Sequence, residues 1–232
     1  MGSPLGSTAR AGWLLWAALG ASAANAAVPL PDVDAIVRYE TRQVTAAGVT
    51  RVESWQERLV RRGDQVWAER VLPQGKLHEH ESVAEQAGHK HFDADTSARW
   101  LTLKADGSVD LRFVDRAHKA VVSVPRAEFG TVGFDGRFDA AASLVPPAVA
   151  LGMKPGAVAG EAQWRTDRRD GWSHRVLWSA TRQLAMRIES SRHDGSVRRI
   201  VTVQLQPAAA ASQLPWRHLA DYTPKNYDDF MD

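Results

Sequence analysis

Residues 172–205 read WSHRVLWSATRQLAMRIESSRHDGSVRRIVTVQL, and this stretch decides the fold class. Apolar residues recur at alternate positions in three successive runs, at 172–178, where His174 shares their face, and at 184–188 and 201–205. Such alternation places apolar side chains on one face of a β-strand. Asp194-Gly195 separates the last two runs and suits a tight hairpin turn, since the pair tolerates positive φ angles. The stretch therefore predicts consecutive antiparallel strands.

The same alternation occurs earlier in the chain, at 37–41 and 109–113, with further Asp-Gly turn pairs at 106–107 and 170–171. Roughly ten strands are expected in all. Helix is predicted only at 95–100, with Asp95 as the N-cap, and at 138–145, before a helical turn at 147–153. The predicted fold class is mainly β with few helices.

The N-terminal residues 1–26 have the layout of a signal peptide. Arg10 supplies a positive charge, a short apolar run follows, and Ala24-Asn25-Ala26 offers a cleavage site. We therefore expect export to the periplasm, followed by a single β-rich domain over 27–207. Residues 208–232 are interpreted as a linker and a tail. This tail either lies on the domain through its aromatic residues or is mobile.

Charge and cysteine content exclude several function classes. The formal net charge of +2 includes Arg10, and the remaining charges of both signs are interspersed, so a nucleic-acid partner is not expected. The chain has no cysteine, which removes disulfides, thiolate metal sites and cysteine nucleophiles. No segment after the signal peptide is apolar enough to predict a transmembrane helix.

Two segments resemble LolA/LolB-like periplasmic proteins, a lipoprotein-carrier-like family. Residues 175–204 have the strand, turn, strand and glycine-hairpin order of the C-terminal half of these proteins, and 108–124 resemble one of their hairpins. The resemblance implies an antiparallel open half-barrel wrapped around a short helical plug, with an apolar cavity that holds acyl chains. It includes no motif diagnostic of the lipoprotein carriers themselves.

The large apolar residues are candidates for lining such a cavity, because tryptophan and methionine offer much apolar area. The alternative is an ordinary core between the sheet and the helices. The candidate lining residues are Trp55, Leu59, Trp100, Phe113, Trp178, Met186 and Ile188.

A histidine cluster is the most specific local pattern. His78 and His80 form one H-x-H pair, and His89 and His91 form a second. On two adjacent antiparallel strands, all four imidazoles would meet on one face and suit Cu²⁺ or Zn²⁺. The alternatives are solvated surface histidines and a pH-sensitive or partner contact.

Catalytic motifs are missing from the sequence. It contains no G-x-S-x-G, no H-E-x-x-H, no P-loop and no dinucleotide fingerprint. The sequence thus predicts a periplasmic, non-catalytic binding or carrier protein for a lipid or other apolar ligand. Two alternatives are a periplasmic metal-binding protein that uses the histidine cluster and an accessory subunit of a complex, with a periplasmic or membrane protein as its partner.

Overall fold

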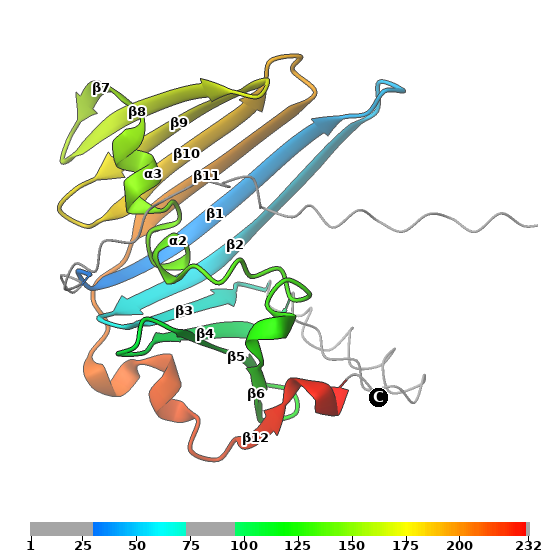
Figure 1. Ribbon diagram of the computed structural model, residues 1–232, viewed down its shortest axis with the longest axis vertical. Coiled ribbons are helices and arrows are strands. Elements are labelled where there is room, and N and C mark those ends of the chain that lie inside the picture. The colour runs from blue at the N-terminus through cyan, green and yellow to red at the C-terminus, as the bar shows by residue number, and fades with distance from the viewer. Residues whose placement is uncertain (1–29, 73–95, 231–232) are drawn as a thin grey trace, which may run out of the picture.

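The computed structural model describes residues 30–72 and 96–230, and these form one twelve-stranded open sheet (Figure 1). The strand order is β12-β6-β5-β4-β3-β2-β1-β11-β10-β9-β8-β7. Every neighbouring pair is antiparallel except β12 and β6. The mainly β class with few helices is confirmed.

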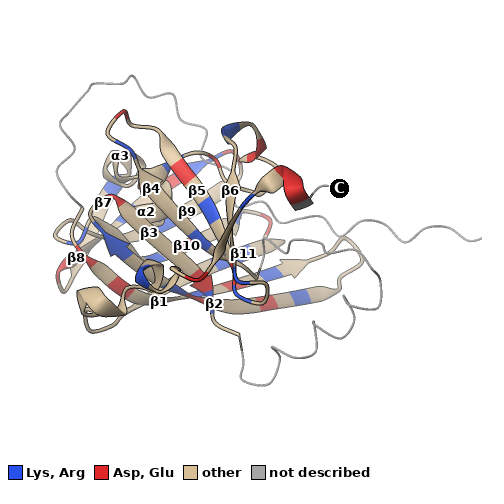
Figure 2. Cartoon of the chain, turned by 90° about the horizontal axis from the view of Figure 1, so that it is seen from below, with Lys and Arg blue, Asp and Glu red and all other residues tan. Residues whose placement is uncertain are grey.

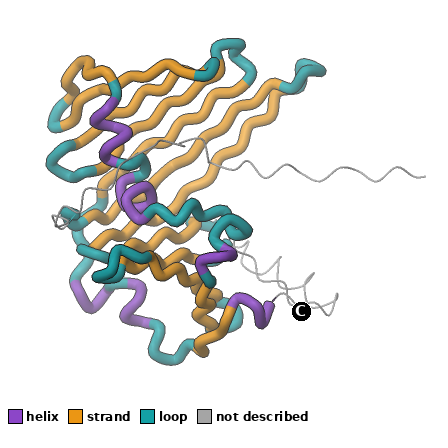
Figure 3. Tube along the Cα trace, in the orientation of Figure 1, coloured by secondary structure: helices purple, strands orange, loops and turns teal. Residues whose placement is uncertain are grey.

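The strands are β1 (Val33–Val44), β2 (Thr50–Arg62), β3 (Gln65–Arg70), β4 (Ala98–Leu103), β5 (Val109–Asp115), β6 (Ala120–Val124), β7 (Lys154–Ala159), β8 (Ala162–Arg169), β9 (Trp172–Ser179), β10 (Leu184–Arg192), β11 (Val197–Leu205) and β12 (Thr223–Asn226). The helices are η2 (Arg126–Glu128), α2 (Phe138–Ser143), α3 (Pro147–Gly152), η3 (Ala211–Gln213), η4 (Pro215–His218) and η5 (Tyr227–Phe230) (Figure 3).

Turn chemistry explains the hairpins. Gly107, Gly171 and Gly195 have φ angles of 80°, 75° and 74°, which the predicted Asp-Gly turns require. The centre of the sheet is β1, which pairs with β2 on one side and with β11 on the other. Charged residues of both signs are spread over the strands (Figure 2).

The helices α2 and α3 lie on one face of the sheet, which we call the helix-side face (Figure 1). The main core is on this face, where Phe129, Phe134 and Phe138 cluster with Leu111 and Phe113. Each α-helix has only six residues and covers part of the face. The open antiparallel sheet is as predicted, but the helical plug with the sheet wrapped around it is not confirmed.

A second core lies on the opposite face of the sheet. It contains the fully buried Trp67 of β3, together with Val60 and Val114. Leu214 and Trp216, from the segment after β11, pack against it. Residues 206–230 therefore cover this face as well as the edge of β6.

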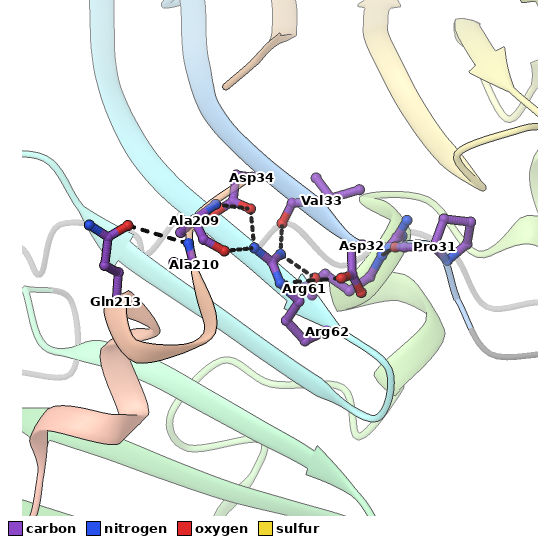
Figure 4. Close-up of polar contacts among 9 residues, drawn as sticks. All are labelled: Pro31, Asp32, Val33, Asp34, Arg61, Arg62, Ala209, Ala210 and Gln213. Atoms are coloured by element: carbon purple, nitrogen blue, oxygen red, sulfur yellow. Dashed lines mark hydrogen bonds and ion pairs between the residues drawn. The ribbon is translucent and has the colours of Figure 1, made fainter. Parts of the chain in front are cut away.

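The C-terminal segment is attached to the sheet at both of its ends. Near its start, the Ala209 backbone N–H donates to the Asp34 carboxylate at 3.3 Å, and Arg62 donates to both Asp34 and the Ala209 carbonyl (Figure 4). Near its end, β12 pairs with β6 and Tyr227 is buried in the main core. Of the two sequence interpretations, the described part of the tail follows the one in which it lies on the domain.

Two expectations need correction. The predicted helix at 95–100 is wrong, because Ala98 begins strand β4, in which Trp100 pairs with Trp67 and Arg112. Cross-strand partners of this size outweigh a capping signal in so short a segment. The expected number of strands was also low, since β7 and β12 show no clear alternation in sequence.

Candidate ligand-binding face

The helix-side face is filled where α2 and the 125–137 loop cover it. Leu59 and Phe113 are buried there in the main core, at 2% and 0% exposure. Trp178 is buried under α3 with Val145 and Met153 in a smaller cluster. These three predicted lining residues therefore serve as core among the described side chains.

Beginning beside α3, where Val176 is buried with Ala150 and Met153, one transverse row of side chains crosses five strands. Antiparallel partners share a face, and successive pairings link the residues of this row across β9, β10, β11, β1 and β2. We call it the apolar row, and it consists of Val176, Ile188, Val201, Tyr39 and Trp55. Four strand spacings make it about 19 Å long.

The apolar row ends in an aromatic pair. Tyr39 and Trp55 stack with ring centroids 5.0 Å apart and an interplanar angle of 12°. The Tyr39 hydroxyl donates to the Glu57 carboxylate at 3.1 Å, and Arg99 lies 3.8 Å from the same carboxylate. Burial raises the pKa of Tyr39, and the negative charge of Glu57 adds to this. The phenol is therefore a neutral donor with a fixed orientation.

Half-buried apolar surface remains along this row. Val176 and Val201 are buried, whereas Ile188, Tyr39 and Trp55 each keep partial exposure. Ile188 and Tyr39 pack against the main core on one side. The apolar row is therefore the margin of the core, and a ligand that lies along it would extend the core.

A second row runs parallel to the first, one pleat further from the helices. Its members are linked by the same pairings and are polar. We call it the polar row, and it consists of Asp167, His174, Ser190, Arg199, Thr41 and Glu53. His174 Nδ1 lies 3.0 Å from Ser190 Oγ. Burial lowers the pKa of His174, and the positive charge of Arg169 adds to this against an opposing effect of Asp167.

The predicted lining residues are only partly brought together. Trp55 and Ile188 belong to the apolar row, and Met186 is half-buried beside the main core. Trp100 lies on the opposite face, near the second core, where its indole N–H donates to Gln65 at 3.2 Å.

Sequence reasoning missed Tyr39, Glu57 and Arg199. Tyr39 stood in a recognised alternating run, but nothing local indicated which residue of a distant strand would pair with it.

The metal hypothesis concerns His78, His80, His89 and His91, which lie outside the described residues, as does the predicted signal peptide over 1–26. Within 30–72 and 96–230, no three His, Asp or Glu side chains group closely enough to hold a metal ion. In the same ranges, no helix is long and apolar enough to cross a membrane. Binding of a Cu or Zn ion by these four histidines therefore stays a prediction.

Comparison with known proteins gives distant structural similarity only. No protein-family model and no curated protein matches the sequence. PNGF-II is similar at a TM-score of 0.38 and 10% identity over 86% of this chain, which spans 32% of the length of PNGF-II.

Two smaller proteins are similar over most of their length. A putative outer membrane lipoprotein-sorting protein domain from Vibrio parahaemolyticus has a TM-score of 0.36 and 11% identity, with 81% of this chain and 91% of the domain covered. A LolA superfamily protein from Nitrosomonas europaea has a TM-score of 0.34 and 7% identity, with 80% and 91% covered. The second carries the name of the family that residues 175–204 and 108–124 resemble.

Proposed function

We propose that this protein is an exported, non-catalytic binding or carrier protein for a ligand with an apolar chain, which lies along the apolar row. The observation that carries the proposal is the row itself. It places Ile188, Val201, Tyr39 and Trp55 in register on four consecutive strands of the sheet, β10, β11, β1 and β2, at the margin of the main core. Export is proposed from the signal-peptide layout of residues 1–26.

Burial of apolar area would supply the affinity. Each methylene group removed from water contributes about 0.8 kcal/mol. The part of the row from Ile188 to Trp55, which keeps exposed apolar surface, spans three strand spacings or about 14 Å. It can therefore contact enough of an acyl chain to bind it without any specific polar contact. The stacked Tyr39–Trp55 pair suits this role because its geometry is already fixed before a ligand arrives.

A binding assay with a dansyl-labelled fatty acid tests the proposal, together with a lipid-extraction mass spectrum of the purified protein. Trp55→Ala removes the outermost ring of the apolar row, and we expect it to weaken probe binding about tenfold, since burial of a large side chain contributes roughly 1.5–3 kcal/mol.

Trp164→Ala is the matched control. Trp164 is also half-buried, but it lies on the opposite face of β8, where Arg175 covers its ring at 4.4 Å. This variant should bind the probe as the wild type does. The proposal fails if the wild type takes up no probe and carries no lipid, or if both variants lose affinity equally.

A further inference from the structure

At the far end of the helix-side face, two arginines converge on one indole ring. The Cζ atoms of Arg192 and Arg199 lie 5.4 and 5.5 Å from the ring centre of Trp172. Trp172 pairs with Arg192 across β9 and β10, and it stacks on His174 with centroids 6.0 Å apart. The ring therefore attracts two cations from two different strands.

The charge of this region is unbalanced. On the helix-side face of β8–β11, the paired positions include Arg165, Arg169, Arg192 and Arg199 but only one carboxylate, Asp167. Asp167 lies 3.0 Å from Arg169 in an ion pair. In the neighbouring hairpin, the Asp194 carboxylate accepts hydrogen bonds from the Ser196 backbone N–H and hydroxyl. These bonds lower the pKa of Asp194, and the positive charge of Arg192 adds to this. The face carries a net positive charge where Arg192 and Arg199 meet.

Hydrogen-bond donors suited to an anion lie at these two arginines and beside them. The guanidinium groups carry N–H donors in a fixed fork, and Ser190 adds a hydroxyl between Arg199 and His174 in the polar row. Arg199 is half-buried, and this burial lowers the pKa of its guanidinium. A bound anion would interact favourably with this cation in its half-buried setting.

The position of the cations relative to the apolar row indicates the kind of anion. Arg199 and Val201 are two residues apart on β11 and share a face, as do Ser190 and Ile188 on β10. The polar row therefore lies directly beside the apolar row. Resting on the function proposed above, we infer that Arg192, Arg199 and Ser190 bind the anionic headgroup of a lipid whose chain lies along the apolar row.

Matched amphiphiles test this inference. Dodecanoate and dodecanol share one chain, and only the first has a charged headgroup. We expect the wild type to bind dodecanoate about tenfold more tightly, as a charge-assisted contact provides. In an Arg192→Gln/Arg199→Gln variant, the two affinities should become equal, with dodecanol binding unchanged.

Arg198→Gln is the control, since Arg198 is exposed on the opposite face of β11. It should keep the preference for dodecanoate. Salt provides a test without any variant: raising NaCl from about 50 mM to about 500 mM should weaken dodecanoate binding and leave dodecanol binding alone.

The outcomes separate the two proposals. Equal wild-type affinities for dodecanoate and dodecanol, or a preference that survives in the double variant, overturn the headgroup site and leave the carrier function standing. If neither amphiphile binds, the carrier function fails and the headgroup site with it. If inorganic phosphate displaces dodecanoate at equal concentration, the site holds a free anion and the lipid assignment is wrong.

Discussion

Arg61 is a fully buried cation whose replacement should show how the helices are held on the sheet. Its side chain is 0% exposed, and it donates only to backbone carbonyls. Nε donates to Pro31 at 2.8 Å, and Nη1 donates to Ala142 at 2.7 Å, at the end of α2. The β9–β10 turn supplies two more acceptors, Gln183 at 3.1 Å and Arg182 at 2.5 Å. One guanidinium thus joins three segments that are distant in sequence.

The magnitude follows from opposing contributions. Burial lowers the pKa of Arg61 from its ordinary value to about 10, which corresponds to a cost on the order of 3 kcal/mol. Four hydrogen bonds from a charged donor contribute about 1.5–3 kcal/mol each. Arg61→Met removes these bonds and leaves buried carbonyls without partners, so we expect the free energy of unfolding to fall by about 3–5 kcal/mol.

Urea denaturation followed by tryptophan fluorescence measures the effect. Arg42→Met is the matched control, because Arg42 is exposed on β1, and it should change the free energy of unfolding by less than about 0.5 kcal/mol. Arg61→Lys keeps the charge but loses the planar fork of donors, so its cost should lie between those of the other two variants. An Arg61→Met protein as stable as the control would refute this account of α2 attachment.

Two further predictions concern Asp34 and His174. Asp34→Ala should lower the free energy of unfolding by about 2–3 kcal/mol, because the 7%-exposed carboxylate accepts from Arg62 and from the Ala209 backbone; urea midpoints check this, and an unchanged midpoint contradicts it. Because burial lowers the folded-state pKa of His174, the unfolded chain binds more protons as pH falls below about 6.5. The free energy of unfolding should therefore keep the full contribution of His174 above that pH and decline below it. His174→Gln should make this decline shallower in thermal melts recorded at several pH values. An unchanged slope in the variant would contradict the prediction.

Much of the strand arrangement could be predicted from local sequence. Alternation marked the strands around Val109 and Val201, and the Asp-Gly pairs marked their turns, because both signals depend on neighbouring residues alone. Where two adjacent residues are both apolar, alternation does not show which of them faces the main core. Trp100 and Leu101 are both apolar, and only the finished sheet shows that Leu101 belongs to the main core and Trp100 to the region of the second.

The candidate site depended on pairings that no local pattern contains. Tyr39 lies beside Val201 only because β1 pairs with β11, a strand that is far away in the sequence. Arg61 gave no sign of burial, since a second arginine follows it directly and its acceptors come from Pro31, Ala142 and the β9–β10 turn. Polar side chains buried in this way are satisfied by tertiary structure, which composition and periodicity do not report.

A β-bulge in β10 determines which side chains reach the proposed site. Ala185 pairs with Trp178 and Arg187 pairs with Leu177, so Met186 is the extra residue between them. An extra residue reverses the alternation of everything that follows. In a regular strand, Arg187 and Glu189 would continue the face of Ala185 and Trp178. With the bulge, Ile188, Ser190 and Arg192 occupy the helix-side face, while Arg187 and Glu189 form an ion pair at 2.7 Å on the other. Simple alternation therefore fails in β10, the strand that supplies Ile188 to the apolar row and places Arg192 beside Trp172. Bulges are frequent next to functional sites, where they change the direction of a side chain.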